Sequence, residues 1–107
     1  MVVPDRGDLV WISIVSRSDD GGSTRRPALV VSPARYNERA GLALMCAVSG
    51  AATGYPFEVS LPQGLPVSGV VLADHLRSTD WKARDATIAC RVPAEVVADV
   101  LAKLKPL

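Results

Sequence analysis

The sequence is poor in the side chains that most often bind metals or transfer protons. It has a single histidine, His75, and two cysteines, Cys46 and Cys90. One subunit therefore cannot use two histidines as acid and base in phosphodiester cleavage. One histidine and two separated cysteines cannot form a four-ligand zinc site of ordinary spacing, and no carboxylate cluster suggests two catalytic metal ions. What remains is metal-free chemistry by arginine, hydroxyl and backbone groups, without a cofactor, or binding alone.

Other familiar signals are also missing. The chain has no GxxxxGK[ST] phosphate loop, no GxGxxG fingerprint and no GxSxG elbow. No apolar run approaches the roughly 20 residues that span a bilayer, and the first residues lack the pattern of a secretory signal. Both cysteines lie inside apolar runs, as expected of buried small hydrophobic residues in a reducing compartment. We therefore predict a cytoplasmic protein with no membrane segment.

The charge of the chain is nearly balanced. Its 107 residues, enough for one domain over 1–107, carry twelve basic and eleven acidic side chains, for a net charge of +1. A surface that binds phosphate must therefore come from local segregation of charge. Residues 25–39 contain four arginines and one acid, Glu38. These arginines fit either such a surface or an ordinary solvated face, and charge alone does not decide between them.

Short strands separated by turn signals dominate the pattern along the chain. Residues 8–16 alternate, with Leu9 and Trp11 on one side and Val10 and Ile12 on the other, which is typical of a central strand. Polar, glycine-containing stretches at 17–25 and 49–54 indicate loops. By the same criteria the sequence predicts strands at residues 8–16, 27–32, 42–48, 57–61, 69–73 and 86–92.

Two helical segments are expected. Residues 33–40 can form a short helix with Ser32 as the N-cap and Gly41 ending it. The segment from Pro93 to the end repeats apolar residues at helical spacing, a stripe typical of core or interface. Trp11 and Trp81 are interpreted in the same way, as core or interface anchors. The expected fold is mainly β with some α: a small, curved, antiparallel sheet closed by a C-terminal helix.

Four segments in series resemble one known family. They are RGDLVW (6–11), RPALVVSP (26–33), GYPFEV (54–59) and GVVLADHLRS (69–78), the last followed by DWKAR (80–84). The same motifs occur in the same order in the MazF/PemK toxins, also called CcdB/PemK-like toxins. A single motif such as RPA would be weak evidence, but four in order at family-like separations are strong. The resemblance covers about residues 6–86, most of the chain.

The resemblance implies a fold and an activity. The family has a small SH3-like β-barrel with short helices and assembles as a homodimer that binds RNA across the dimer surface. It cleaves single-stranded RNA at short sequences without a metal, leaving a 2′,3′-cyclic phosphate and a 5′-hydroxyl. A partner antitoxin of the MazE type blocks the RNA groove with an extended, acidic C-terminal segment. We expect the same fold, activity and partners for this chain.

The resemblance also assigns roles to individual residues. Arg26 matches the family's catalytic arginine, although a structural salt bridge with Glu58 or Asp74 is the alternative interpretation. Ser49 stands where the family has a catalytic threonine, counted back from GYPFEV. Asp74 is interpreted as a structural residue that hydrogen-bonds its own turn. The candidates for contact with RNA are Arg25, Tyr55, Phe57, His75, Arg77 and Arg84.

Two further hypotheses remain at this stage. Serine in place of threonine at position 49, followed by the bare Gly50-Ala51-Ala52 run, fits a weakened relative that binds RNA or an antitoxin without efficient cleavage. A toxin of the same fold that poisons DNA gyrase is the third hypothesis. The RPA…SP motif with Arg26 speaks against it.

Overall fold

The structure is a computed structural model, and it describes residues 2–15 and 23–107. The predicted loop at 17–25 lies outside the described residues over 17–22. Eight elements follow one another along the chain: β1 (Asp8–Val15), β2 (Ser23–Val30), α1 (Ala34–Ala40), β3 (Ala43–Ser49), β4 (Glu58–Ser60), β5 (Val70–Thr79), β6 (Thr87–Arg91) and α2 (Ala94–Leu104).

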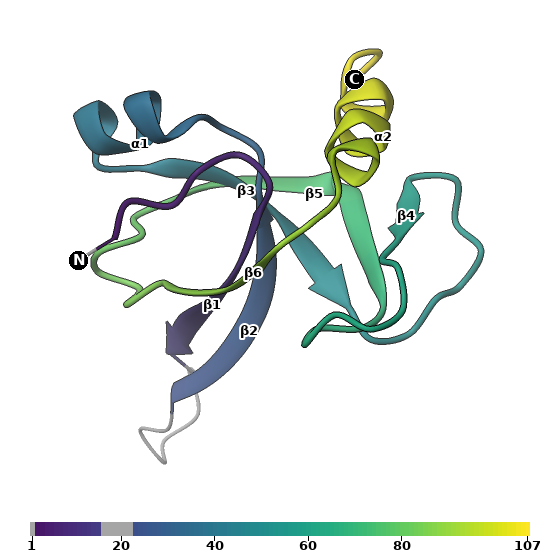
Figure 1. The fold of residues 1–107 in the computed structure, drawn as a ribbon, viewed down its shortest axis with the longest axis horizontal. Helices are drawn as coiled ribbons and strands as arrows, with labels where there is room; N and C mark the ends of the chain where they lie inside the picture. The colour runs from purple at the N-terminus through teal and green to yellow at the C-terminus, as the bar shows by residue number, and fades with distance from the viewer. Residues whose placement is uncertain (1, 16–22) are drawn as a thin grey trace.

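The six strands form one curled antiparallel sheet in the order β4-β5-β3-β2-β1-β6 (Figure 1). Strand β1, the first in the chain, lies between β2 and β6, so the sequence prediction of a central strand is confirmed. Helix α2 packs against β4 and β5, and α1 contacts β3. The expected small, curved, mainly antiparallel fold with short helices is therefore confirmed.

The central strands bury side chains on both of their faces. Leu9 and Leu29 belong to a large cluster that includes residues of α2, such as Val100. Their chain neighbours Val10 and Val30 belong to a second cluster on the opposite face, built around Trp81. Because successive side chains of a strand point to opposite faces, each central strand supplies both clusters. This double burial explains why the apolar runs of β1 and β2 are nearly continuous.

Two strands are longer than the sequence predicts. Strand β2 begins at Ser23 rather than Pro27, because the polar residues before the proline pair with β1 in register. Pro27 is tolerated inside this strand because the ladder to β3 reaches only to Ala28, so no partner strand needs its missing N–H. Strand β5 continues to Thr79 rather than ending at Ala73. The predicted turn at Asp74 is therefore wrong, since Asp74 lies inside β5.

The start of α1 also differs from the prediction. Its N-cap is Pro33, which offers no side-chain hydrogen bond. The first helical N–H, of Ala34, instead donates to the Asp5 carboxylate at 2.8 Å. This bond is the largest cause of a pKa of Asp5 below its ordinary value of 3.8. Gly41 ends the helix in the left-handed conformation, φ 70°, as predicted.

Ser32 is part of a buried polar network rather than a helix cap. Its hydroxyl donates to Asn37 Oδ1, while Asn37 Nδ2 donates to the carbonyl oxygens of Pro4 at 2.7 Å and Ser32 at 3.0 Å. Trp81 Nε1 donates to the Asn37 carbonyl at 3.0 Å. Asn37 is fully buried and Trp81 is 2% exposed. The network joins the N-terminal segment, α1 and the turn before β6.

The remaining sequence expectations concern α2 and the cysteines. Val96 and Val100 of α2 are buried, so the apolar stripe of this helix is used by the chain's own core. Cys46 and Cys90 are both free, and burial raises the pKa of the Cys46 thiol to about 11, with the Asp74 charge adding to the shift. Among the helices of the described residues, none is long and apolar enough to cross a membrane.

Candidate nucleic-acid interface

An open groove of about 1040 Å³ lies on the sheet, and five predicted site residues line it. Its walls come from β1 and β2 on one side, β3 and β5 on the other, and residues 66–68. The five residues are Arg25, Arg26, Ser49, His75 and Arg77.

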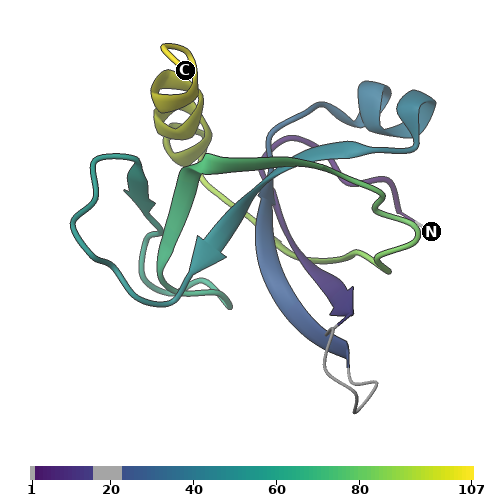
Figure 2. The same cartoon turned by 180° about the vertical axis from the view of Figure 1, so that it is seen from behind.

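Arg26 and Ser49 both line this groove, from β2 and from the end of β3. The β2–β3 ladder pairs Ala28 with Ala47 and goes no further. Continued by two residues, the same register places Arg26 opposite Ser49. Side chains two positions apart in a strand share a face, so Arg26 lies on the side of Ala28 and Ser49 on the side of Ala47. Beyond Ala28 the strands separate, and both views show β2 curving away from the end of β3 (Figure 2).

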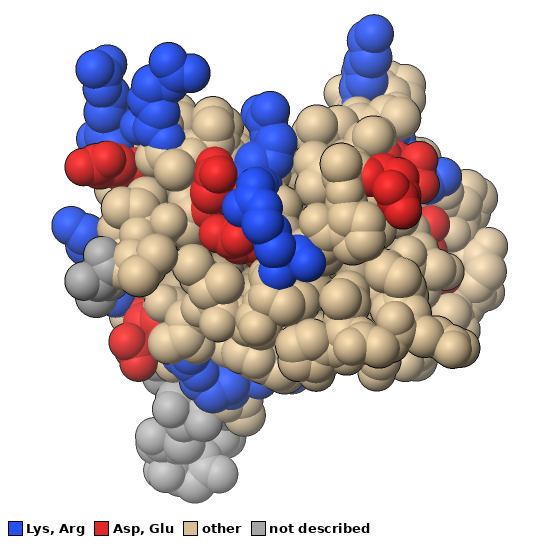
Figure 3. All heavy atoms as spheres, in the orientation of Figure 1, with Lys and Arg blue, Asp and Glu red and all other residues tan. Residues whose placement is uncertain are grey.

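The groove has a positive lining. Three arginines and His75 line it, and no aspartate or glutamate is among its described lining residues. A chain of net charge +1 thus segregates its charge locally, as the sequence analysis requires for a phosphate-binding surface. On the face drawn in Figure 3, the Lys and Arg side chains form separate groups, and several of these groups lie beside Asp or Glu side chains. Within residues 2–15 and 23–107, no group of three or more His, Cys, Asp or Glu could hold a metal ion.

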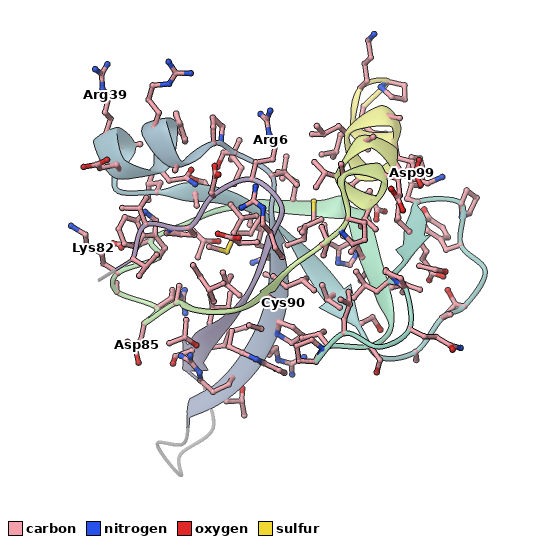
Figure 4. All side chains as sticks on the ribbon, in the orientation of Figure 1. Arg6, Arg39, Lys82, Asp85, Cys90 and Asp99 are labelled. Atoms are coloured by element: carbon pink, nitrogen blue, oxygen red, sulfur yellow. The ribbon has the colours of Figure 1, made fainter. Side chains whose placement is uncertain are left out.

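The guanidinium of Arg25 is engaged by other strands. It donates to Ser13 Oγ at 2.8 Å, to the Asp85 carbonyl at 2.8 Å and to Thr87 Oγ1 at 2.6 Å. Its Nη1 also lies 3.9 Å from Asp85 Oδ2. Asp85 projects from the turn that precedes β6, beside the end of β1 (Figure 4). Arg25 therefore ties β2 to β1 and β6, whereas its neighbour in the groove lining, Arg26, has no ion pair among the described residues.

The structural alternative for Arg26 does not hold. Among the described residues, Arg26 forms no ion pair with Glu58 or Asp74. The Glu58 carboxylate accepts hydrogen bonds from Thr53 and Gly54, and Asp74 lies 4.0 Å from His75 Nε2. The salt-bridge interpretation of Arg26 is therefore wrong for both proposed partners.

The Ser49 hydroxyl is oriented by its own turn. Its oxygen accepts a hydrogen bond from the Ala51 N–H at 3.2 Å. Its proton points to the Ala51 carbonyl at 3.3 Å, which is longer than the roughly 2.5–3.0 Å usual for O–H···O bonds. A phosphate oxygen would be a better acceptor for this proton. Ser49 can therefore donate to an anion in the groove without losing the bond that holds it.

The other predicted contact residues lie outside the groove. The rings of Tyr55 and Phe57 contact each other with centroids 5.7 Å apart and planes tilted by 45°, and Phe57 packs on the larger core cluster. Arg84 lies in the exposed turn before β6, where its carbonyl accepts from the Ser13 N–H at 2.8 Å. The structure does not bring these three residues to Arg26. Arg35 and Arg39 are exposed on α1 and also lie outside the groove, as the solvated-face interpretation expects.

The groove also contains residues that were not predicted as site residues from the sequence. Ile12, Ile14 and Met45 give the groove an apolar floor, and Ser68 lies on the loop at its edge. The alternation of β1 places Ile12 and Ile14 on one face, so that signal was available. No feature of the sequence indicates that residues 66–68 reach the groove.

A known protein family matches nearly the whole chain, including the groove. The family described as PemK-like, MazF-like toxin of type II toxin-antitoxin system matches residues 5–107. The chain belongs to the MazF/PemK family. The matched span includes every residue that lines the groove.

Individual members of the MazF/PemK family are similar to this chain over most of its length. The endoribonuclease toxin MazF of Escherichia coli K12 is 39% identical over 105 residues, 98% of this chain and 94% of the relative. The endoribonuclease PemK of Escherichia coli is 31% identical over 107 residues, 96% of this chain and 80% of the relative. A crystal structure of MazE–MazF from Deinococcus radiodurans superposes with a TM-score of 0.94 at 51% identity, covering 99% of this chain and 96% of that one.

Proposed function

We propose that this chain is a toxin endoribonuclease that cleaves single-stranded RNA without a metal ion. The observation that carries the proposal is the groove lined by both Arg26 and Ser49, with no aspartate or glutamate among its described lining residues. Residues 1–107 would act as one toxin domain in the cytoplasm, where the two free cysteines fit a reducing environment. A MazE-like antitoxin is the expected protein partner, since a relative at 51% identity has been crystallised as a MazE–MazF complex.

The proposed reaction is an internal transesterification of RNA. The 2′-oxygen attacks the adjacent phosphorus and loses its proton, while the bond from phosphorus to the 5′-oxygen breaks and that oxygen takes up a proton. The products are a 2′,3′-cyclic phosphate and a 5′-hydroxyl. Because the nucleophile belongs to the RNA, the protein needs only to orient the attack and to stabilise charge on the phosphate oxygens. Arg26 can supply two parallel hydrogen bonds to phosphate and Ser49 a third.

The test is cleavage of a long, sequence-diverse RNA by purified protein in the presence of EDTA. We expect a limited set of fragments with cyclic phosphate ends, and mapping those ends gives the recognition sequence. If no RNA is cut at high protein concentration, the proposed activity is wrong and binding alone is left. Fragments that appear only when a divalent metal is added would contradict the metal-free mechanism.

The role of Ser49 gives a second prediction. Ser49→Ala should lower kcat by about 10²–10³-fold, the usual effect of removing one transition-state donor. Ser49→Thr should raise kcat by no more than about threefold, because it restricts a side chain that has only three staggered wells. Ser60→Ala, at an exposed serine outside the groove, is the matched control and should cleave like the wild type. A gain well above tenfold in Ser49→Thr would instead support the weakened-relative hypothesis.

We also propose a homodimer. Two features that the sequence offered as possible interface, Trp81 and the apolar stripe of α2, do not support it. Trp81 and the apolar stripe of α2 are used by the core of the chain itself. Leu42 and Leu76 instead remain 37% and 39% exposed near the β3–β5 pair, where apolar surface could be covered by a second copy. Light scattering at micromolar concentration should give twice the chain mass for the wild type and a lower mass for Leu76→Glu. A wild-type monomer would contradict the proposal.

A further inference from the structure

Two contacts fix the segment that carries Ser49, and they are made by three residues without an assigned role: Gly69, Thr53 and Glu58. The first is a close approach of two backbones. Gly69, just before β5, has φ +123°, and a Cβ at this position would overlap the Ser49 carbonyl oxygen and lie 3.0 Å from Gly50 Cα. Only glycine leaves room for this approach. The absence of a side chain at 69 is therefore what allows the end of β3 to lie where it does.

Gly69 itself is held in place from the other side. Its carbonyl accepts the Leu61 N–H at 3.0 Å, and the next residue, Val70, is 3% exposed and pairs with both Ser49 and Ser60. Ser49, in contrast, is the last residue of β3 and is followed by the exposed 50–54 segment. A side chain at 69 would therefore displace Ser49 and Gly50 rather than the start of β5.

The second contact joins the end of the segment after Ser49 to the Glu58 side chain. Glu58, the first residue of β4, accepts three hydrogen bonds: from the Thr53 hydroxyl at 2.6 Å and from the N–H groups of Thr53 and Gly54, both at 3.1 Å. The Thr53 hydroxyl is the main reason that the pKa of Glu58 lies below its ordinary value of 4.5, and the N–H groups add to the effect. The carboxylate is therefore charged at neutral pH, which strengthens these bonds.

We infer that Gly69 and the Thr53–Glu58 contact are positioning elements for Ser49, holding its hydroxyl in place at the groove from both ends of the segment. Neither touches the groove, since Thr53, Glu58 and Gly69 are absent from its lining. They act through Ser49, so the kinetic consequence of the inference rests on the proposed cleavage activity. The structural consequence of the inference, a fixed Ser49 backbone, does not depend on that activity. A transition-state donor must be placed to within a fraction of an ångström, and a displacement of about 1 Å costs on the order of 10²-fold in rate.

The chain supplies matched variants for a test. Gly64 lies in the loop that leads to Gly69 and also has positive φ, +93°, but nothing lies within 4 Å of a Cβ there. Gly64→Ala therefore reproduces the backbone strain of Gly69→Ala without the overlap on Ser49. At the other contact, Thr53→Val keeps the shape of the side chain and removes the hydroxyl, while Thr53→Ser restores the hydroxyl. Thr53 is exposed, so neither change threatens folding.

Each variant is measured in two ways: steady-state cleavage of an RNA oligonucleotide that contains the mapped sequence, and ¹H–¹⁵N spectra of the free protein. We expect Gly69→Ala to lose about 10²-fold in kcat relative to Gly64→Ala, with KM little changed. Thr53→Val should lose about tenfold, because the two N–H bonds to Glu58 remain, and Thr53→Ser should recover most of it. The amide resonances of Ser49 and Gly50 should move in Gly69→Ala and stay in place in Gly64→Ala.

The possible outcomes separate this inference from the proposed function. Equal kcat values for Gly69→Ala and Gly64→Ala, or unmoved Ser49 and Gly50 resonances in Gly69→Ala, would overturn the positioning role. If the wild type cleaves no RNA, the proposed function fails and the resonances alone decide whether Ser49 is held as inferred. If Gly69→Ala does not fold, the Thr53 pair decides: a Thr53→Val protein with wild-type kcat and unmoved Ser49 resonances would contradict the inference.

Discussion

Arg26→Ala is expected to lower kcat for RNA cleavage by at least about 10²–10³-fold, equivalent to roughly 3–4 kcal/mol of transition-state stabilisation. Arg26 lies in a groove without acidic lining residues, opposite Ser49 in the extended register, so its charge is available to an anion. Single-turnover cleavage of an RNA oligonucleotide with excess protein measures the rate of the cleavage step itself, because product release does not contribute. The urea midpoint should stay close to that of the wild type, because Arg26 is exposed.

Two further variants make the Arg26 result specific. Arg26→Lys keeps the positive charge but not the planar pair of donors, and it should recover only a small part of the lost rate. Arg39→Ala removes an exposed arginine of α1 (Figure 4) that does not line the groove, and it should leave cleavage unchanged. Full cleavage by Arg26→Ala would show either a contaminating nuclease or a different catalytic arginine. In that case the assignment of Arg26 is wrong.

Asn37→Ala is expected to lower the free energy of unfolding by about 3 kcal/mol or more, because each buried polar group left without a partner costs about 1–3 kcal/mol. The substitution removes the donors to the Pro4 and Ser32 carbonyl oxygens and the acceptor for the Ser32 hydroxyl, all inside the protein. Urea unfolding followed by Trp fluorescence measures the change. Trp81 is a suitable reporter, since its Nε1 bonds the Asn37 carbonyl.

The neighbours of Asn37 on α1 provide the control. Tyr36 and Glu38 are exposed, and replacing either with alanine should change the free energy of unfolding by no more than about 0.5 kcal/mol. Below its unfolding transition, Asn37→Ala should cleave RNA at the wild-type rate, because Asn37 does not line the groove. A destabilisation under 1 kcal/mol would mean that water replaces the lost partners, contrary to the burial of the site.

The strands that were predicted correctly are those with a strong apolar signal. In β1 and in the second half of β2, alternate residues enter two cores, and the pattern of apolar residues records this directly. The extension of β5 carries no such signal, since residues 74–78 are all exposed. Residues 23–26 are polar and follow two glycines, so they resemble a loop, yet backbone pairing with β1 makes them a strand. Pairing of this kind depends on the partner strand and cannot be predicted from local composition.

The candidate site was predictable only in part. The resemblance named Arg26 and Ser49, and the structure brings these residues, 23 positions apart in the chain, to the lining of one groove. Tyr55 and Phe57 follow the Ser49 loop in sequence, but Phe57 packs on the core cluster that includes α2, and Tyr55 contacts the Phe57 ring rather than the groove. Proximity in sequence was a poor guide there.

The place of β1 in the sheet has a consequence for synthesis of the protein. Strand β1 is made first of the six strands and β6 last, yet the two are neighbours, with Asp8 paired to Arg91. Until β6 has left the ribosome, β1 has one partner and an open edge, and Arg25 lacks its partners Asp85 and Thr87. Long-range pairing of this kind forms late and slowly. A ribosome-bound chain that still lacks β6 therefore has an unpaired β1 edge beside the groove, and the sheet that carries the groove is complete only after all six strands have been translated.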